Sequence, residues 1–157
     1  MKQILFPKIV NNNYKGHKIA KWFLYLYVFR QIGASFVHMF TADGGAQSIA
    51  SITLDAFSTD AAGAVISMFG MWGMEQLVIG LIIIVILTRY KSLIPAAWLV
   101  YSIEFIGRFM MKYITPGVPT THTPPGVLLD YMFVPLAIIM LIVSVISTKK
   151  NMELIDE

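Results

Sequence analysis

Residues 61–88 read AAGAVISMFGMWGMEQLVIGLIIIVILT, and Glu75 is the only charged residue among them. An α-helix rises about 1.5 Å per residue, so about 20 residues cross the roughly 30 Å hydrocarbon core of a bilayer. The stretch is longer than this, and its second half is almost pure hydrocarbon. It therefore predicts a membrane-spanning helix.

Three more hydrophobic segments are long enough to span a bilayer. They run from about residue 19 to 41, from 93 to 114 and from 127 to 147. A soluble protein rarely repeats such segments in a chain of 157 residues, because its surface must be solvated by water. We therefore expect an all-α protein in which residues 1–157 form one membrane domain, a bundle of four transmembrane helices.

The composition agrees with a membrane protein. Hydrophobic residues make up 57% of the chain and charged residues 13%, whereas an ordinary soluble domain has about 25% charged residues. This balance argues against a disordered chain, a soluble enzyme and a protein that binds nucleic acid. The chain has no cysteine, which excludes disulfides, CxxC redox pairs and thiolate metal sites.

Lysine and arginine alternate between the segments that connect the predicted spans. Residues 1–21 hold five lysines, whereas residues 42–60 hold aspartates and neither lysine nor arginine. The next turn holds Arg89 and Lys91, and the third connection has only Lys112 at its edge. Cytoplasmic connections carry an excess of lysine and arginine, so we expect both termini in the cytoplasm of a bacterium and the spans in its cytoplasmic (inner) membrane.

The two outer connections are the long ones. In residues 42–60, the side chains of Ile49, Ile52, Ala56 and Phe57 recur at a helix-like spacing, which predicts a short interfacial helix. The other connection, TPGVPTTHTPPG, contains four prolines, which exclude a regular helix. Two interpretations of this proline-rich connection stay open: a defined edge or lid, and a surface linker.

Four charged residues inside the predicted spans are the main candidates for a functional site. Arg30, Glu75 and Glu104 lie near the middle of the first, second and third span. Arg108 lies one turn beyond Glu104 on the same helix face. A charge at mid-bilayer costs about 2.5–3.5 kcal/mol on insertion scales, so it usually faces a partner inside the bundle. We expect a network in which Arg30 lies between the two glutamates and Arg108 supports Glu104; it is either a structural lock or a binding site.

Helical spacing places other polar and aromatic residues on the same faces as these charges. The polar residues run from mid-membrane towards the outside, which predicts a cavity that opens outwards or laterally in the outer leaflet. A single histidine lies within the spans, so we expect no metal or haem site. The expected ligand-binding residues are Arg30, Gln31, His38, Trp72, Glu75, Tyr101, Glu104 and Arg108.

The second span also carries a face of small residues, which lets helices approach each other closely. We expect this face to pack within the bundle or against another subunit. Its members are Gly63, Ser67, Gly70, Gly73 and Gly80.

The segments YVFRQIG (27–33), EQLVIG (75–80) with the closing Thr88-Arg89, and IGR (106–108) resemble the DoxX-like superfamily. The resemblance covers roughly residues 25–147 and places Arg30, Glu75 and Arg89 at family-like positions. It implies a four-helix integral membrane protein, which in some members is a small subunit of a quinone-linked oxidoreductase. Redox-associated branches often have cysteine pairs, and this chain has none.

Two functions of different classes stay open. The first is a small membrane subunit or accessory protein whose Arg/Glu cluster contacts a quinone, a lipid, a partner membrane protein or a second copy of the chain. The second is a small membrane enzyme or carrier for a lipophilic substrate, with Glu75 or Glu104 as proton donor or acceptor. No nucleophile–base motif, phosphate loop or metal-ligand spacing supports the second, so we favour the first. A quinone is the one cofactor that this interpretation allows.

Overall fold

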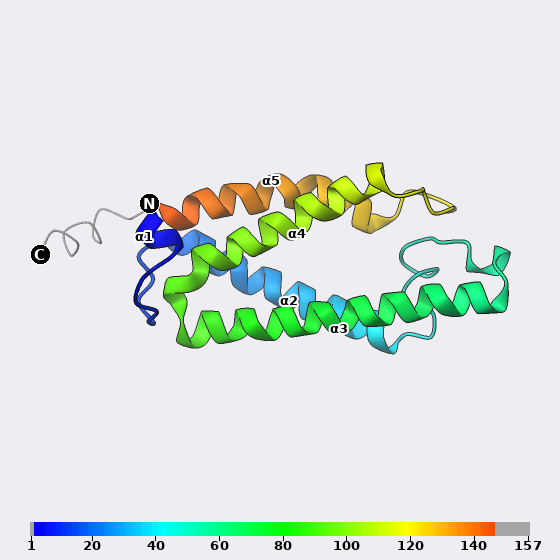
Figure 1. Ribbon diagram of the computed structural model, residues 1–157, viewed down its shortest axis with the longest axis horizontal. Coiled ribbons are helices and arrows are strands. Elements are labelled where there is room, and N and C mark those ends of the chain that lie inside the picture. Colours follow the sequence, from blue (N-terminus) through cyan, green and yellow to red (C-terminus); the bar gives the residue numbers. More distant parts are fainter. Residues whose placement is uncertain (1, 147–157) are drawn as a thin grey trace, which may run out of the picture.

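The computed structural model describes residues 2–146, and it is an elongated bundle of helices (Figure 1). Within these residues there is no β-strand, only one isolated bridge between two loops. Residue 1 and residues 147–157 of the expected single domain, with the predicted end of the last span, lie outside the described part. The helices are α1 (Lys2–Leu5), α2 (Lys18–Phe40), α3 (Thr59–Arg89), α4 (Ile94–Ile114) and α5 (Pro125–Val145), with two short 3-10 helices, η1 (Leu54–Ala56) and η2 (Lys91–Leu93).

The four long helices coincide with the four predicted spans. Three stretches, α3, α5 and Lys91–Ile114 with α4, are long and apolar enough to cross a membrane. Helix α2 has 23 residues and is slightly longer than α4 and α5, which have 21 each, but Arg30, Gln31 and His38 make it less apolar. The all-helical architecture of the described residues is therefore confirmed, with three helices long and apolar enough to cross a membrane, and the fourth span stays a prediction.

The long helices alternate in direction, so the connections gather at two ends of the molecule (Figure 1). We call the end with α1, the α3–α4 turn and the end of α5 the inner end. The opposite end, with the connections 41–58 and 115–124, is the outer end. Helix α3 packs mainly against α2, and α4 packs mainly against α5.

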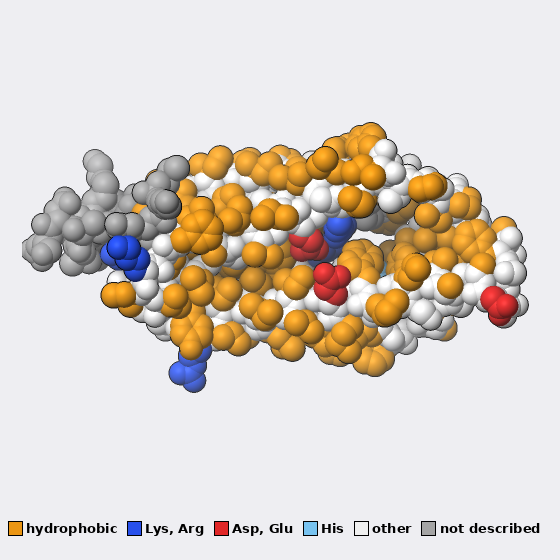
Figure 2. Space-filling view, in the orientation of Figure 1, with side chains coloured by type: hydrophobic (Ala, Val, Ile, Leu, Met, Phe, Trp, Pro, Cys, Tyr) orange, Lys and Arg blue, Asp and Glu red, His pale blue; other side chains and the backbone are white. Residues whose placement is uncertain are grey.

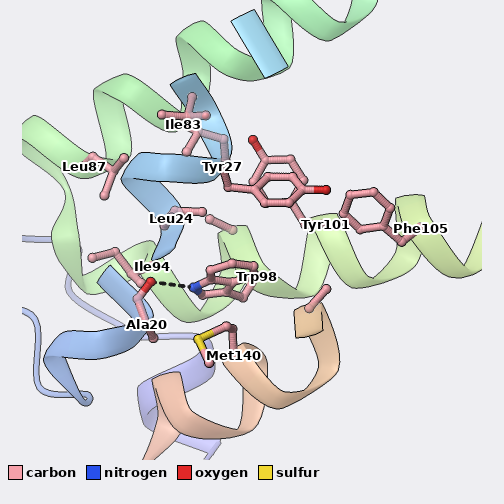
Figure 3. Close-up of a cluster of buried hydrophobic side chains, with 13 residues drawn as sticks. Ala20, Leu24, Tyr27, Ile83, Leu87, Ile94, Trp98, Tyr101, Phe105 and Met140 are labelled. Carbon is pink, nitrogen blue, oxygen red and sulfur yellow. Dashed lines mark hydrogen bonds between the residues drawn. The ribbon is translucent and has the colours of Figure 1, made fainter. Parts of the chain in front are cut away.

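An aromatic core holds the helices together over the inner half of the bundle (Figure 3). The ring of Tyr27 on α2 lies 4.7 Å from that of Tyr101 and 5.2 Å from that of Phe105, both on α4. The indole Nε1 of Trp98 donates a hydrogen bond of 3.0 Å to the backbone carbonyl of Ala20. These contacts join α2 to α4, and Phe133 of α5, 5.3 Å from Tyr27, completes the cluster.

Helix α2 approaches α3 most closely at two glycines of the predicted small face. A Cβ atom on Gly73 would lie 2.8 Å from Cβ of His38, and one on Gly80 would lie 2.9 Å from Cγ1 of Ile32. A Cβ on Gly70 would have ordinary contacts and one on Gly63 would meet nothing within 4 Å. The small face therefore packs inside the bundle at Gly73 and Gly80.

The outward surfaces of the helices are strongly apolar (Figure 2). Ile103 is 63% exposed and Met132 is 66% exposed, and similar side chains continue along α3. Only 11% of the residues in the apolar window of α5 are buried within the bundle. Apolar area of this extent is unusual on a monomer in water, whereas hydrocarbon chains solvate it well.

The expected interfacial helix in the first outer connection does not form. Its only helical turn is η1, and the chain instead folds back so that Ala46, Ile52 and Leu54 are buried against the outer part of α3. The carboxylate of Asp43 accepts hydrogen bonds from the backbone N–H groups of Gly45, Gln47 and Ser48, which holds a compact turn. Burial against α3 thus prevails over the helix-like spacing.

The proline-rich connection is a defined edge, because it is bonded to the first outer connection. The N–H of Thr121 donates to the carbonyl of Ser51 at 3.0 Å, and the N–H of Thr53 donates to the carbonyl of Pro119 at 3.3 Å. The hydroxyl of Ser51 lies 2.6 Å from Nε2 of His122. Ser51 has a φ of +59°, so the backbone is held in a left-handed conformation at this junction.

Candidate functional site

A cavity of about 580 Å³ lies at the outer end, between all four long helices and the two joined connections. Such volumes are typical of small-molecule sites, which run from about 300 to 1,000 Å³. The walls are mostly apolar, with Val37, Ile49, Phe69 and Trp72 among them. Figure 2 shows a hollow on this side of the molecule, next to acidic and basic side chains near its middle.

Arg108 of α4 organises one polar wall of the cavity. Its Nη2 lies 2.7 Å from Oδ1 of Asp130 on α5, and its Nη1 lies 3.9 Å from Oε1 of Glu104. Its guanidinium also lies 5.4 Å from the ring centre of Trp72 and 5.5 Å from that of Phe105. Two carboxylates and two aromatic faces therefore fix this arginine, and the predicted pairing of Arg108 with Glu104 is present.

Arg30 of α2 lies on the cavity in a different environment. Its guanidinium is 5.1 Å from the ring centre of Phe133. Within residues 2–146 it makes no hydrogen bond and has no carboxylate within 4.0 Å. The expected network therefore has no direct contact of Arg30 with Glu75 or Glu104 within 4.0 Å, although Arg30 and Glu75 both lie close enough to Glu104 to interact with it electrostatically.

The position of Glu75 explains this difference. Gly73 faces α2 at close range, and Glu75 is two residues further on, about 200° around the helix axis. Glu75 is accordingly exposed on the surface of α3 and does not line the cavity. The structure thus leaves Glu75 outside the cavity lining, although it still interacts electrostatically with Glu104.

Four of the eight predicted site residues line the cavity: Arg30, His38, Trp72 and Arg108. His38 has a structural role as well. Its Nδ1 lies 2.8 Å from the carbonyl oxygen of Gly44, and its ring stacks on Trp72 with centroids 4.6 Å apart.

The other four predicted residues lie elsewhere. Gln31 is buried and donates from Nε2 to the backbone carbonyl of Gln76 at 3.1 Å, which ties α2 to α3. Tyr101 is a fully buried core residue, and Glu104 lies behind Arg108. With Glu75 exposed on α3, these residues support or surround the bundle and do not form the cavity wall.

Sequence reasoning missed several wall residues. Lys112 follows Arg108 by four residues and so shares its helix face, a signal that was available in the sequence. Its Nζ lies 3.1 Å from the hydroxyl of Tyr131 and 3.7 Å from the ring centre of Phe109. Asp130 was a second available signal, because it is a charge at the start of an otherwise apolar span. The wall residues from the two outer connections, such as Ile49 and Val118, carry no charge or spacing pattern that would have identified them from the sequence.

Buried polar atoms without partners lie in the core of the bundle. Within the described residues, the hydroxyls of Tyr27 and Tyr101 and Oε2 of Glu104 have no hydrogen-bond partner, and neither does Oε1 of Gln76. Such atoms are rare in proteins. The part of the chain from residue 2 to 146 contains no group of three or more His, Asp or Glu side chains placed to hold a metal ion.

No protein-family model matches this chain, and no curated protein or solved structure matches it. The chemistry of the cavity is therefore the basis on which a function can be assigned.

Proposed function

We propose that this protein is a small integral membrane protein that binds a lipophilic ligand, a quinone or a membrane lipid, in the outer cavity. The observation that carries the proposal is the cavity itself: about 580 Å³ with mostly apolar walls and a few polar groups, between helices of which three are long and apolar enough to cross a bilayer. Ligand sites of this class are concave and mostly apolar, with a small number of polar groups that orient the ligand.

The charges at the two ends support a cytoplasmic inner end. Lys8, Lys18 and Lys21 lie near the inner end, together with Arg89 and Lys91. The first outer connection carries carboxylates without lysine or arginine. On this orientation α2 is a fourth span, both termini are cytoplasmic, and the cavity lies in the outer half of the membrane. The sequence has two more lysines after the fourth predicted span, Lys149 and Lys150, but they lie outside the described residues.

We place the protein among small accessory subunits of the DoxX-like kind. The support is four helices with short inner turns and an arginine, Arg30, midway along α2. Exposed apolar side chains on α3, α4 and α5 make membrane lipid the first partner. A partner membrane protein or a second copy of the chain is the alternative that size measurements in detergent would show.

A second candidate is a membrane enzyme or carrier in which Glu104 transfers a proton. One observation favours it: within the described part of the chain, Oε2 of Glu104 is buried without a hydrogen-bond partner, and Arg108 lies nearby. Glu75 does not share this environment, since it is exposed on α3. This candidate requires that Glu104→Gln abolish turnover of a lipophilic substrate and leave its binding intact.

Trp72 supplies a direct test of ligand binding, because it lines the cavity. In a Trp22→Phe background, which removes the exposed tryptophan, only Trp72 and the fully buried Trp98 remain. The protein in phosphatidylcholine nanodiscs is titrated with dibromostearyl alcohol, whose bromines quench tryptophan on contact. We expect saturable quenching, and competition by decylubiquinone would identify a quinone site.

Two matched variants locate the signal. Ala34→Phe fills the cavity and should abolish saturable quenching. Gly33→Phe, on the exposed side of the same helix, has open space around its Cβ and should leave quenching unchanged. Quenching that rises linearly with the probe in all variants would refute a binding cavity.

A further inference from the structure

We propose that the ligand is an anionic amphiphile, an aliphatic chain with a carboxylate or phosphate head group, and that Arg30 binds the head group. The inference rests on the proposed ligand-binding function of the outer cavity and names the chemical class of its ligand. The proposal therefore favours an acidic lipid as the ligand over a neutral quinone or a neutral alcohol.

The charge of the cavity wall is the first support. Arg30, Arg108 and Lys112 line it, and Asp130 is the only carboxylate among the lining residues. Asp130 is bound to Arg108 at 2.7 Å and is not available to another cation. Glu104 and Glu75 do not line the cavity, so the lining residues carry more positive than negative groups.

The environment of Arg30 is the second support. Its guanidinium is partly buried beside Phe133, with no carboxylate within 4.0 Å among the described residues. A charge removed from water is costly unless another charge or hydrogen bonds compensate it. A guanidinium binds carboxylate or phosphate through two parallel hydrogen bonds, so an anionic head group is the ligand that compensates Arg30 best.

The other two cations do not compete for this role. Arg108 is held by Asp130 and lies between the rings of Trp72 and Phe105. Lys112 donates to the hydroxyl of Tyr131 and lies over aromatic rings. Both add positive potential, while Arg30 retains the capacity for a new bidentate contact.

The apolar side chains provide for the aliphatic part of the ligand. Val37 follows Arg30 on α2 towards the outer end, and Phe69 precedes Trp72 on α3. Ile49 and Ile52 close the site from the first outer connection. A guanidinium with no carboxylate within 4.0 Å among the described residues, set in mainly apolar walls, fits an amphiphile better than a free inorganic anion.

The test compares two probes with the same chain and different heads. In the Trp22→Phe protein, dibromostearic acid in its ionised form should half-saturate the quenching of Trp72 at a concentration about tenfold lower than dibromostearyl alcohol does. Arg30→Gln should remove this preference, so that acid and alcohol half-saturate the quenching at similar concentrations, whereas Arg30→Lys should keep part of it. Arg89→Gln, an exposed arginine at the inner end of α3, is the matched control and should keep the full preference.

A second pair of probes distinguishes the source of the anion. Lysophosphatidic acid and lysophosphatidylcholine, each with a dibromostearoyl chain, test whether a phosphate monoester head serves as well as a carboxylate. Inorganic phosphate, added as a competitor, tests whether the head group binds without the chain, and we expect no competition.

The outcomes separate the two proposals. Equal half-saturation by the acid and the alcohol would overturn the anionic ligand and leave the lipophilic cavity standing. An acid preference that survives in a folded Arg30→Gln variant would also overturn the role of Arg30. Absence of saturable quenching with every probe would refute the cavity function itself. The comparison of acid and alcohol in the Trp22→Phe protein requires no substitution at Arg30, so it decides the charge of the ligand even if Arg30→Gln does not fold, and Arg30→Lys then tests the role of Arg30.

Discussion

The guanidinium of Arg108 and the carboxylate of Asp130 lie 2.7 Å apart, which joins the outer halves of α4 and α5 beside the cavity. Both side chains are largely shielded, with 23% and 12% of their surfaces exposed. Ion pairs in such places are weak sources of net stability, but the loss of one partner is costly because the other charge remains uncompensated.

Asp130→Asn should therefore lower the free energy of unfolding by about 1–3 kcal/mol, less than for a fully buried pair because both groups keep some exposure. The double variant Asp130→Asn/Arg108→Gln should regain part of this loss. Thermal unfolding in nanodiscs, compared with Asp60→Asn at the exposed start of α3, measures the effect. Equal melting temperatures for the Asp130 and Asp60 variants would show that the pair does not matter.

Gly73→Ala should destabilise the bundle, whereas Gly63→Ala should not. An added Cβ at Gly73 would lie 2.8 Å from Cβ of His38 and 2.9 Å from the carbonyl oxygen of Ser35, but the same atom at Gly63 meets nothing within 4 Å. Overpacking of this kind costs about 1–3 kcal/mol. Because Gly73 faces α2 in the same chain, size in detergent should not change. A shift in oligomeric size without loss of melting temperature would instead place the glycine face at a subunit interface.

Tyr101→Phe should leave stability unchanged or raise it by up to about 1 kcal/mol, because its hydroxyl is buried without a partner among the described residues. Trp98→Phe is the contrasting change. It removes the 3.0 Å hydrogen bond to the carbonyl of Ala20 and leaves a void, so it should cost about 2–4 kcal/mol. Chemical denaturation of both variants in the same detergent provides the comparison. A large loss for Tyr101→Phe would indicate that a bound water or ligand uses this hydroxyl.

The first outer connection should open in acid. Partial burial raises the pKa of Asp43, but hydrogen bonds from Ser48 and Gly45 outweigh burial and lower the pKa from 3.8 to about 2. A carboxyl group whose pKa is lower in the folded state stabilises the fold above its unfolded pKa, and this stabilisation is lost as the pH falls through the folded value. Pepsin cleavage within residues 41–50 should therefore increase as the pH falls from 3.8 to about 2.

Asp43→Ala is the control for this measurement. It lacks the carboxylate, so cleavage of its loop should be high throughout the same range and follow only the activity of pepsin on an unfolded peptide. Wild-type cleavage with the same pH profile as Asp43→Ala would contradict the role of Asp43.

The positions of the long helices followed from hydrophobic length and local signals. The stretch predicted at 61–88 is helix Thr59–Arg89, and the side chain of Ser58 caps it by accepting a hydrogen bond from the N–H of Ala61. Proline stands in the first turn of both α4 and α5, where its missing N–H costs nothing. Helix positions, caps and first-turn prolines depend only on neighbours along the chain, so they can be predicted from the sequence without knowledge of the tertiary structure.

Helix faces were harder to interpret than helix positions. Spacing showed which residues share a face, and the outward cavity with Arg30, His38, Trp72 and Arg108 agrees with it. Spacing did not show which carboxylate would form the short contact with which arginine, because it does not say how one helix is rotated against another.

The sequence was enough to establish an apolar, all-helical chain with three stretches suited to a bilayer, because a helix satisfies its own backbone and needs only length and hydrophobicity. Only the tertiary structure decided which charges meet. Asp130 forms the short ion pair with Arg108, Glu75 is exposed on α3, and Arg30 faces the cavity with no carboxylate within 4.0 Å among the described residues. Such contacts depend on the distance and rotation between helices far apart in the chain, and these are set by packing of the whole bundle rather than by any local pattern.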